Sequence, residues 1–287
     1  MVLTTPLTLT PYARRYRRDL LRLIDDHYRI HIHLDWLTVD QWLDEPDALI
    51  WLVWDENVLA GALAAAPPDD TTTWIRLTAV HDDYNPGQVL SELWPPFREQ
   101  LFGLGARQIG LLVQRPWLYA HLELFGMEPY DQIVTLQHCG GEWPTNHSLE
   151  SSIRPAELRD LGSALMVDHA AFAAPWRMSP SSLREAIRQA FSFTLAFDRN
   201  APVGYQISTR YANGGHLARL ATVPDHQGQG VGGALLGDLL TRFARRGITC
   251  VSVNTQQSNQ QSQRLYQRFG FGFSGPDIPV WTAWLRG

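Results

Sequence analysis

The chain has 287 residues and a formal net charge of −5, with 45% hydrophobic and 18% charged residues. This length exceeds one typical domain of roughly 100–200 residues, and the apolar share is enough for a packed core, which disfavours intrinsic disorder. The acidic balance disfavours a general nucleic-acid-binding protein, so we expect no nucleic-acid partner. All 24 basic residues are arginines, which excludes a P-loop lysine and any mechanism through a lysine Schiff base.

The cysteines and the N-terminal segment bear on location. Cys139 and Cys250 lie far apart without CxxC spacing, which indicates neither a disulfide scaffold nor a zinc ribbon. The N-terminal segment lacks the pattern of a signal peptide, and no apolar run reaches 18 residues. We therefore expect a soluble, cytoplasmic protein without a membrane partner.

The first half alternates helical and strand patterns. In chain order, the expected elements are a helix over 12–33, a hairpin of strands 49–54 and 58–66, a strand over 73–80, a helix over 88–104, a strand over 108–113 and a helix around 117–125.

The second half repeats this order. The expected elements are a strand over 148–154, a helix over 156–172, a helix opened by Ser179, a hairpin of strands 191–197 and 203–211, a strand over 216–223, a helix ending near 246, a strand over 249–254 and a helix over 259–269. An internal repeat of about 143 residues predicts two similar domains, 1–145 and 146–287, with the boundary in 140–148. Two unrelated α/β halves are the alternative.

A glycine-rich turn, Gln227-Gly228-Gln229-Gly230-Val231-Gly232-Gly233, follows a predicted strand and opens a predicted helix. Backbone N–H groups converge at the positive end of a helix, and glycine permits close approach of a ligand, so the turn predicts an anion site. A turn that merely ends a strand is the alternative. A dinucleotide fold would need an acidic residue about 20 positions on, and none lies between Asp238 and Asp277.

Two spacings carry a family resemblance. Gln227-x-x-Gly230-x-Gly232 resembles the [QR]xxGx[GA] signature of the GNAT superfamily of acyl-CoA-dependent N-acyltransferases. Asn259-x-x-Ser262-x-x-Leu265-Tyr266-x-x-x-Gly270-Phe271 resembles the second signature of that family. The detailed match covers about residues 216–273, and the order of elements extends it over 150–287.

The resemblance implies an α/β (α+β) fold of two GNAT-like domains, each a central mixed, mostly antiparallel sheet flanked by helices. In the C-terminal domain the strands 216–223 and 249–254 would splay apart to form an acyl-CoA cleft. Acetyl-CoA would be the co-substrate, with no metal. Its pantetheine arm would pair with the backbone of Ala221, Thr222 and Val223. Its pyrophosphate would bind the amides of Gln227, Gly228, Gln229, Gly230, Val231, Gly232 and Gly233.

The second signature implies two further roles. Asn259 would hydrogen-bond the pantetheine arm, and Tyr266 would protonate the leaving thiolate. The chemistry of Tyr266 agrees, because a phenol with a pKa of about 10 can donate a proton to a thiolate. A tyrosine that only packs its ring in the core is the alternative.

The sequence assigns no general base. Arg219 and Asn254 stand where many relatives carry a glutamate, and neither is a plausible base. His216 has a suitable ordinary pKa of about 6.5, but a histidine near a strand end is an equally good interpretation. We therefore expect a weakly basic acceptor amine, such as an α-amino group.

The first half lacks the binding signature. Pro86 and Leu90 stand in the segment that matches the glycine turn, and Leu122 stands where Tyr266 does in the second half. The first domain is therefore expected to be degenerate and non-catalytic, as in other tandem members of the superfamily.

Two weaker features remain open. His31, His33 and Asp35 could bind a metal, but a surface or core role is favoured. Trp176 could line the acceptor site or anchor its loop.

Together these features predict an N-acetyltransferase that transfers acetyl from acetyl-CoA to a primary amine by direct attack in a ternary complex. The acceptor would be a small-molecule amine or a peptide N-terminus, and the protein a monomer or homodimer. A catalytically silent acyl-CoA-binding or scaffolding protein is the alternative.

Overall fold

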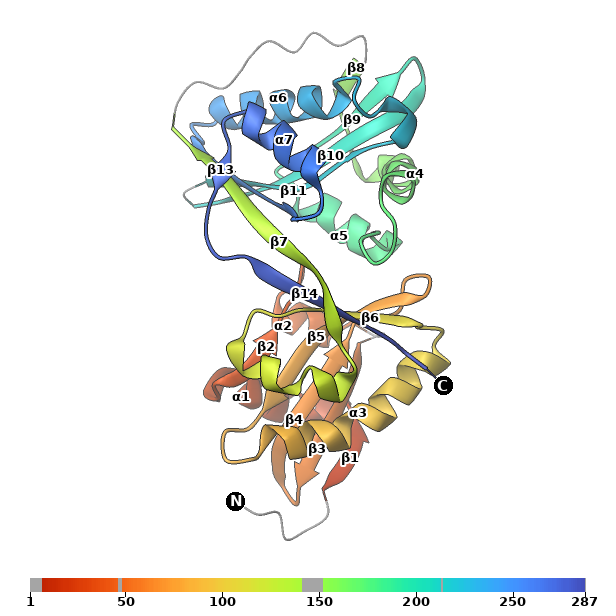
Figure 1. The fold of residues 1–287 in the computed structure, drawn as a ribbon, viewed down its shortest axis with the longest axis vertical. Coiled ribbons are helices and arrows are strands. Elements are labelled where there is room, and N and C mark those ends of the chain that lie inside the picture. The colour runs from red at the N-terminus through yellow and green to blue at the C-terminus, as the bar shows by residue number, and fades with distance from the viewer. Residues whose placement is uncertain (1–6, 46–47, 141–151, 213, 287) are drawn as a thin grey trace. The chain divides into compact units, whose positions relative to one another are not determined.

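The computed structural model describes residues 7–45, 48–140, 152–212 and 214–286. It divides into two compact units, one of Met1–Asp131 with Ile278–Gly287 and one of Gln132–Asp277 (Figure 1). The expected boundary between residues 145 and 146 lies outside the described residues. The second unit begins at Gln132, within β7, and the C-terminal strand belongs to the first unit.

The first unit contains a sheet in the order β1-β3-β4-β5-β6-β14, with β2 pairing to β5. Its elements are β1 (Thr8–Pro11), η1 (Arg14–Tyr16), α1 (Arg17–Asp26), β2 (Arg29–Ile32), α2 (Val39–Leu43), β3 (Leu49–Asp55), β4 (Val58–Ala65), β5 (Thr72–Val80), α3 (Pro86–Gly103), β6 (Gln108–Leu112), η2 (Pro116–His121), η3 (Glu123–Phe125) and β14 (Ile278–Trp284). Apolar side chains of α1 and α2 pack on one face of the sheet, and those of α3 on the other.

The helix expected over 12–33 is wrong in its second half. α1 ends at Asp26, and the chain forms the strand β2. Ile30 and Ile32, two residues apart, both pack against the apolar side chains of α1 and α2, and His31 between them is buried. This alternation around β-branched residues favours a strand over a helix. The helix expected around 117–125 is likewise two short 3-10 helices, η2 and η3.

The second unit contains a sheet in the order β7-β12-β11-β10-β9-β8, with β13 beside β7. Its elements are β7 (Glu128–Cys139), which begins in the first unit, β8 (Ser152–Pro155), η4 (Leu158–Asp160), α4 (Leu161–Ala171), α5 (Pro180–Gln189), β9 (Ser192–Asp198), β10 (Ala201–Tyr211), β11 (Gly214–Thr222), η5 (Pro224–His226), α6 (Val231–Ala244), β12 (Cys250–Gln256), α7 (Gln260–Arg268) and β13 (Gly272–Phe273).

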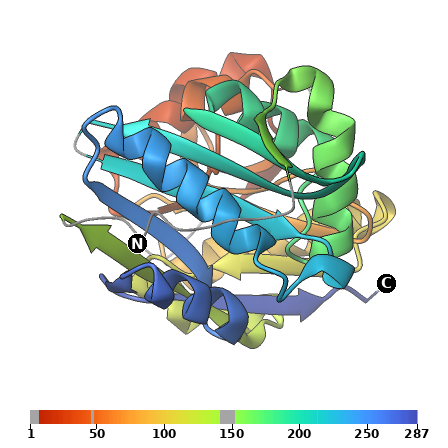
Figure 2. The same ribbon diagram turned by 90° about the horizontal axis from the view of Figure 1, so that it is seen from above.

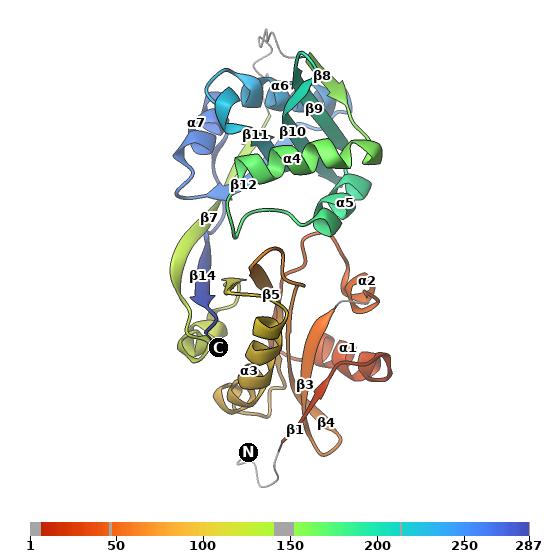
Figure 3. The ribbon, with the colours of Figure 1, turned by 90° about the vertical axis from the view of Figure 1, so that its right-hand side faces the viewer.

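Helices cover both faces of the second sheet. α6 and α7 pack their apolar side chains with those of β11 and β12 in one core cluster. The green helices α4 and α5 lie on the opposite face (Figures 2 and 3). The predicted fold of two helix-flanked mixed sheets is thus confirmed.

The sequence did not predict β7 and β14. β14 pairs antiparallel with β6, and β7 pairs antiparallel with β12. This second pairing sets Cys139 opposite Cys250, and the two form a disulfide. The spacing of the two cysteines gave no sign of this single bridge, because it joins strands that lie 111 residues apart along the chain. No helix among the described residues is both long and apolar enough to span a membrane.

Candidate active site

The candidate site begins where two parallel strands of the second unit separate. β11 and β12 pair through Gly215–Leu217 and Val251–Val253. In the described part of the chain, no register continues this pairing toward Thr222, so the last residues of β11 present a backbone edge to the gap. The splayed strands inferred from the sequence are confirmed.

The glycine turn joins this edge to α6. Gly228 and Gly230 adopt positive φ angles of 75° and 90°, which side chains other than glycine rarely tolerate. The side-chain Nε2 of Gln227 donates to the carbonyl oxygen of Thr222 at 3.0 Å. The side-chain Nε2 of Gln229 donates to the carbonyl oxygen of Asp225 at 2.7 Å. Both side chains therefore brace the turn from within.

The start of α6 suits an anion. No side chain caps this helix at Gly230, and the first N–H groups of a helix have no carbonyl partner within it. A Cβ at Gly232 would lie 3.3 Å from Leu265, so a larger residue there would fill the space in front of the helix. Backbone donors and a glycine surface fit the pyrophosphate of an acyl-CoA.

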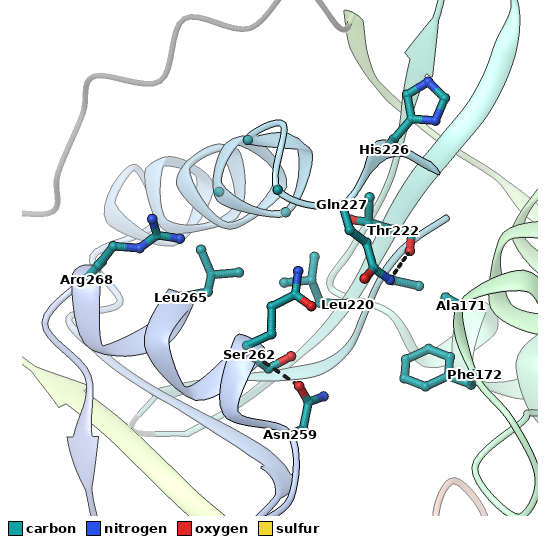
Figure 4. Close-up of a pocket in the computed structure, with 16 residues that line it drawn as sticks. Ala171, Phe172, Leu220, Thr222, His226, Gln227, Asn259, Ser262, Leu265 and Arg268 are labelled. Carbon is teal, nitrogen blue, oxygen red and sulfur yellow. Dashed lines mark hydrogen bonds between the residues drawn. The ribbon is translucent and has the colours of Figure 1, made fainter. Parts of the chain in front are cut away.

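The strand edge, the turn and α7 enclose a cavity of about 210 Å³ (Figure 4). It is lined by Ala171, Phe172, Leu220, Ala221, Thr222, His226, Gln227, Gly228, Gly230, Gly232, Gly233, Asn259, Gln261, Ser262, Leu265 and Arg268.

Most of the predicted binding residues meet in this cavity. The lining includes Ala221, Thr222, Gln227, Gly228, Gly230, Gly232, Gly233 and Asn259. Gln229 and Val231 do not line it, and Val231, the first residue of α6, is buried against the sheet. Val223 also lies outside, and its N–H donates to the carbonyl oxygen of Val203 at 2.9 Å, away from the gap.

Asn259 has a structural role in addition to its place in the lining. Its Oδ1 accepts the N–H of Ser262 at 3.1 Å and so caps the start of α7. The side-chain NH₂ group of the same amide remains as a hydrogen-bond donor at the cavity wall.

Tyr266 lies behind the cavity wall and not in it. Its side chain is 4% exposed and packs near Phe271 in the core of the unit. Its hydroxyl is hydrogen-bonded to Ser262, which does line the cavity. Burial raises the pKa of Tyr266 above its ordinary value of about 10, and the hydrogen bond with Ser262 offsets this only in part. The phenol therefore stays protonated at neutral pH.

The sequence interpretation missed several lining residues. Gln261, Leu265 and Arg268 follow one another at spacings of four and three, which places them on one face of α7 and could have identified them. Arg268 is the one arginine of the lining, and within the described residues it forms no ion pair. Phe172 follows α4 and carried no sequence signal of its own.

None of the three residues considered as a base has clear access to the cavity. Arg219 is held in a buried ion pair with Asp168, at 2.7 Å. The carbonyl oxygen of the Asn254 side chain accepts from the Thr135 hydroxyl at 3.0 Å. His216 lies where β11 and β12 are still paired, 2.9 Å from the Ser252 hydroxyl, and burial lowers its pKa.

The matching part of the first unit is built differently. β5 and β6 pair through Thr72–Trp74 and Gln108–Gly110, as β11 and β12 do. The last four residues of β5, Leu77–Val80, then pair with β2. In the first unit, β2 thus occupies the edge of β5 that corresponds to the free edge at the end of β11.

The start of α3 also differs from that of α6. Asn85 Oδ1 accepts the N–H of Gln88 at 3.2 Å, so a side chain caps the helix, and Pro86 follows without an N–H. Leu90 and Leu122 are buried, at 0% and 2% exposure.

His31 of β2 and His33, which follows it, are not grouped with other metal-ligating side chains in the described residues. His33 and Asp35 associate with Arg76, and neither ring nitrogen of buried His31 has a hydrogen-bond partner. Across the described ranges, no group of three or more His, Cys, Asp or Glu side chains is arranged to hold a metal.

Comparison with known proteins bears on the second unit. The profile of the Acetyltransferase (GNAT) family matches residues 161–271. Ribosomal protein bS18-alanine N-acetyltransferase of Escherichia coli is 27% identical over 121 residues, which cover 42% of this chain and 80% of that protein. Mycothiol acetyltransferase of Brachybacterium faecium is 36% identical over 61 residues, 21% of this chain and 18% of that protein.

The whole chain resembles a solved structure of the same architecture. A tandem GNAT protein from the clavulanic acid biosynthesis pathway superposes with a TM-score of 0.67 over 98% of this chain and 99% of that one, at 16% identity. This likeness concerns the fold. Residues 161–271 themselves form a domain of the GNAT acetyltransferase family, and the chain is accordingly an acyltransferase.

Proposed function

We propose that the second unit transfers an acetyl group from acetyl-CoA to a primary amine by direct attack. The observation that carries this proposal is the meeting of a free strand edge, an uncapped glycine turn and Asn259 around one cavity. The pantetheine arm would pair with the backbone at Ala221 and Thr222 and accept a hydrogen bond from Asn259. The pyrophosphate would take the N–H groups at the start of α6, with Arg268 near enough to add positive charge.

The chemistry needs a nucleophile, a leaving group and an acid. The neutral amine attacks the thioester carbonyl carbon, the C–N bond forms, and the C–S bond breaks with the electron pair leaving on sulfur. Tyr266, protonated at neutral pH, supplies a proton to the thiolate, directly or through the Ser262 hydroxyl. The proton lost by the amine passes to solvent, and Tyr266 regains a proton from solvent before the next turnover.

The acceptor is an amine that is already partly neutral. Arg219 and Asn254 cannot take a proton from an ammonium group, and His216 lies in the paired part of the strands. An α-amino group has a pKa of about 7.7–8.0 and a lysine side chain about 10.4, so deprotonating the latter costs about 3.4 kcal/mol more. The name of the Escherichia coli relative, an alanine N-acetyltransferase, agrees with an α-amine acceptor. Small-molecule amines of similar basicity are equally suitable.

The test is amine-dependent release of free thiol from acetyl-CoA by the full chain. The panel contains a peptide with a free N-terminus, the same peptide with a blocked N-terminus and one lysine, and small amines of graded pKa. At pH 7 we expect kcat/KM to favour the free N-terminus by about 300-fold. The rate should rise with pH up to the pKa of the amine and show no falling limb below about pH 10, because burial raises the pKa of Tyr266.

Two outcomes would contradict the proposal. Binding of coenzyme A without thiol release for any amine would favour the silent binding protein. A preference for the most basic amines at pH 7 would show that a base operates in the site.

A further inference from the structure

The segment between α4 and α5, residues 172–179, contributes Phe172 to the cavity lining and contains no helix or strand. Phe172 lines the cavity beside the end of β11, where the pantetheine arm and the acyl group would lie (Figure 4). Because this wall lacks regular structure, something else must fix its position.

Arg219 of β11 makes two contacts with this segment. Its Nη2 donates to the carbonyl oxygen of Trp176 at 2.7 Å. Its guanidinium centre lies 3.7 Å from the centroid of the Phe172 ring, in cation–π stacking distance. A planar guanidinium can stack its face on a ring while its N–H groups donate in its own plane, a geometry that a lysine ammonium lacks.

Arg219 is itself held by buried groups. Asp168 Oδ2 accepts from Arg219 Nε at 2.8 Å and from the Tyr205 hydroxyl at 2.6 Å, while Asp168 Oδ1 accepts the N–H of Met178 at 3.0 Å. Asp168 and Tyr205 are both 0% exposed. Three well-packed apolar residues could stabilise such a core equally well, so stability alone does not account for a buried ion pair.

The first unit contains a similar contact. Arg76 of β5 pairs with Asp35 at 2.7 Å, and its Nη1 donates to the carbonyl oxygen of His33 at 3.4 Å. His33 and Asp35 lie between α1 and α2, the segment that matches 172–179. An arginine from the corresponding strand therefore binds the corresponding segment in both units.

We propose that Arg219 is a positioning residue for acyl transfer. It holds Phe172 and the carbonyl of Trp176, and thereby fixes the wall of the cavity beside the reacting groups, while Asp168 and Tyr205 hold Arg219. This inference rests on the proposed function. Misplacing a wall of an active site by about 1 Å can lower turnover by up to about 100-fold without loss of ligand binding.

The test uses Arg219→Lys, which keeps a charge opposite Asp168 but loses the planar stack, with Arg76→Lys as the matched control in the first unit. In Arg219→Lys we expect kcat/KM for the amine to fall about 10-fold to 100-fold while the Kd for coenzyme A changes less than threefold. Arg76→Lys should leave both values unchanged. Phe172→Leu should lower kcat/KM by a similar factor. The double variant Arg219→Lys/Phe172→Leu should have a kcat/KM no lower than that of the less active single variant.

Hydrogen exchange provides a readout that does not depend on turnover. Amides of 172–178 should exchange faster in Arg219→Lys than in the wild type, with the amides of α6 unchanged. Unchanged exchange in 172–178, a parallel loss of coenzyme A binding, or multiplicative losses in the double variant would each overturn the inference. A wild-type protein without turnover would instead contradict the proposed function, and the exchange data would still decide the role of Arg219.

Discussion

The two units share one architecture but differ at one strand edge and at the start of one helix. In the second unit the edge at the end of β11 is free, and α6 starts at Gly230 without a side-chain cap. In the first unit β2 pairs with the end of β5, and Asn85 caps α3. Both units therefore satisfy the same backbone groups, one through its own chain and the other, we infer, through a ligand. The comparison teaches that one architecture can leave a strand edge and a helix start open, or close both with its own chain.

The largest expected effect concerns the acid, since the second unit has Tyr266 where the first has buried Leu122. Tyr266→Phe should lower kcat by about 10²–10³-fold, the range for a positioned acid, with the Kd for coenzyme A nearly unchanged. Steady-state kinetics and calorimetry together measure this. Tyr211→Phe, an exposed tyrosine of the same unit, is the control. An unchanged kcat would mean that Tyr266 only packs in the core.

A smaller effect is expected when one residue of the second unit is replaced by the residue type found at the matching position of the first unit. Gly232→Leu introduces the residue type that Leu90 has at the matching position of the first unit. The Cβ at position 232 would lie 3.3 Å from the Leu265 side chain. We expect the Kd for coenzyme A to rise about 100-fold, or about 2.7 kcal/mol, because the side chain fills the space in front of the helix. Gly272→Leu adds the same side chain where no atom lies within 4 Å of the Cβ and serves as the control. Equal affinity in both variants would contradict the assigned binding surface.

The smallest expected effect lies in the first unit. Asn85→Ala removes the cap of α3 and should cost about 1 kcal/mol of stability, without changing kcat or coenzyme A binding. Denaturant unfolding and kinetics on the same preparation check both halves of this expectation. A gain of a second coenzyme A site in this variant would show that the cap alone closes the first unit.

The sequence was informative where local chemistry dictates structure. The glycine turn and the helix that carries Tyr266 follow from short-range patterns, and residues that line the cavity were named from them. The edge strand β2 was missed because its residues also fit a helical pattern, and pairing with β5 decided the outcome. β14 and the disulfide were missed because both depend on contacts between distant segments. Phe172 was missed for the same reason, since its place depends on Arg219 from another strand.

The central claim is that the second unit binds coenzyme A and the first does not. Calorimetric titration of the full chain with coenzyme A tests it most directly, with Gly230→Pro as the comparison because proline cannot adopt the φ of 90° found there. We predict one site per chain in the wild type and none in Gly230→Pro. Two equivalent sites, or a site that survives Gly230→Pro, would contradict the account.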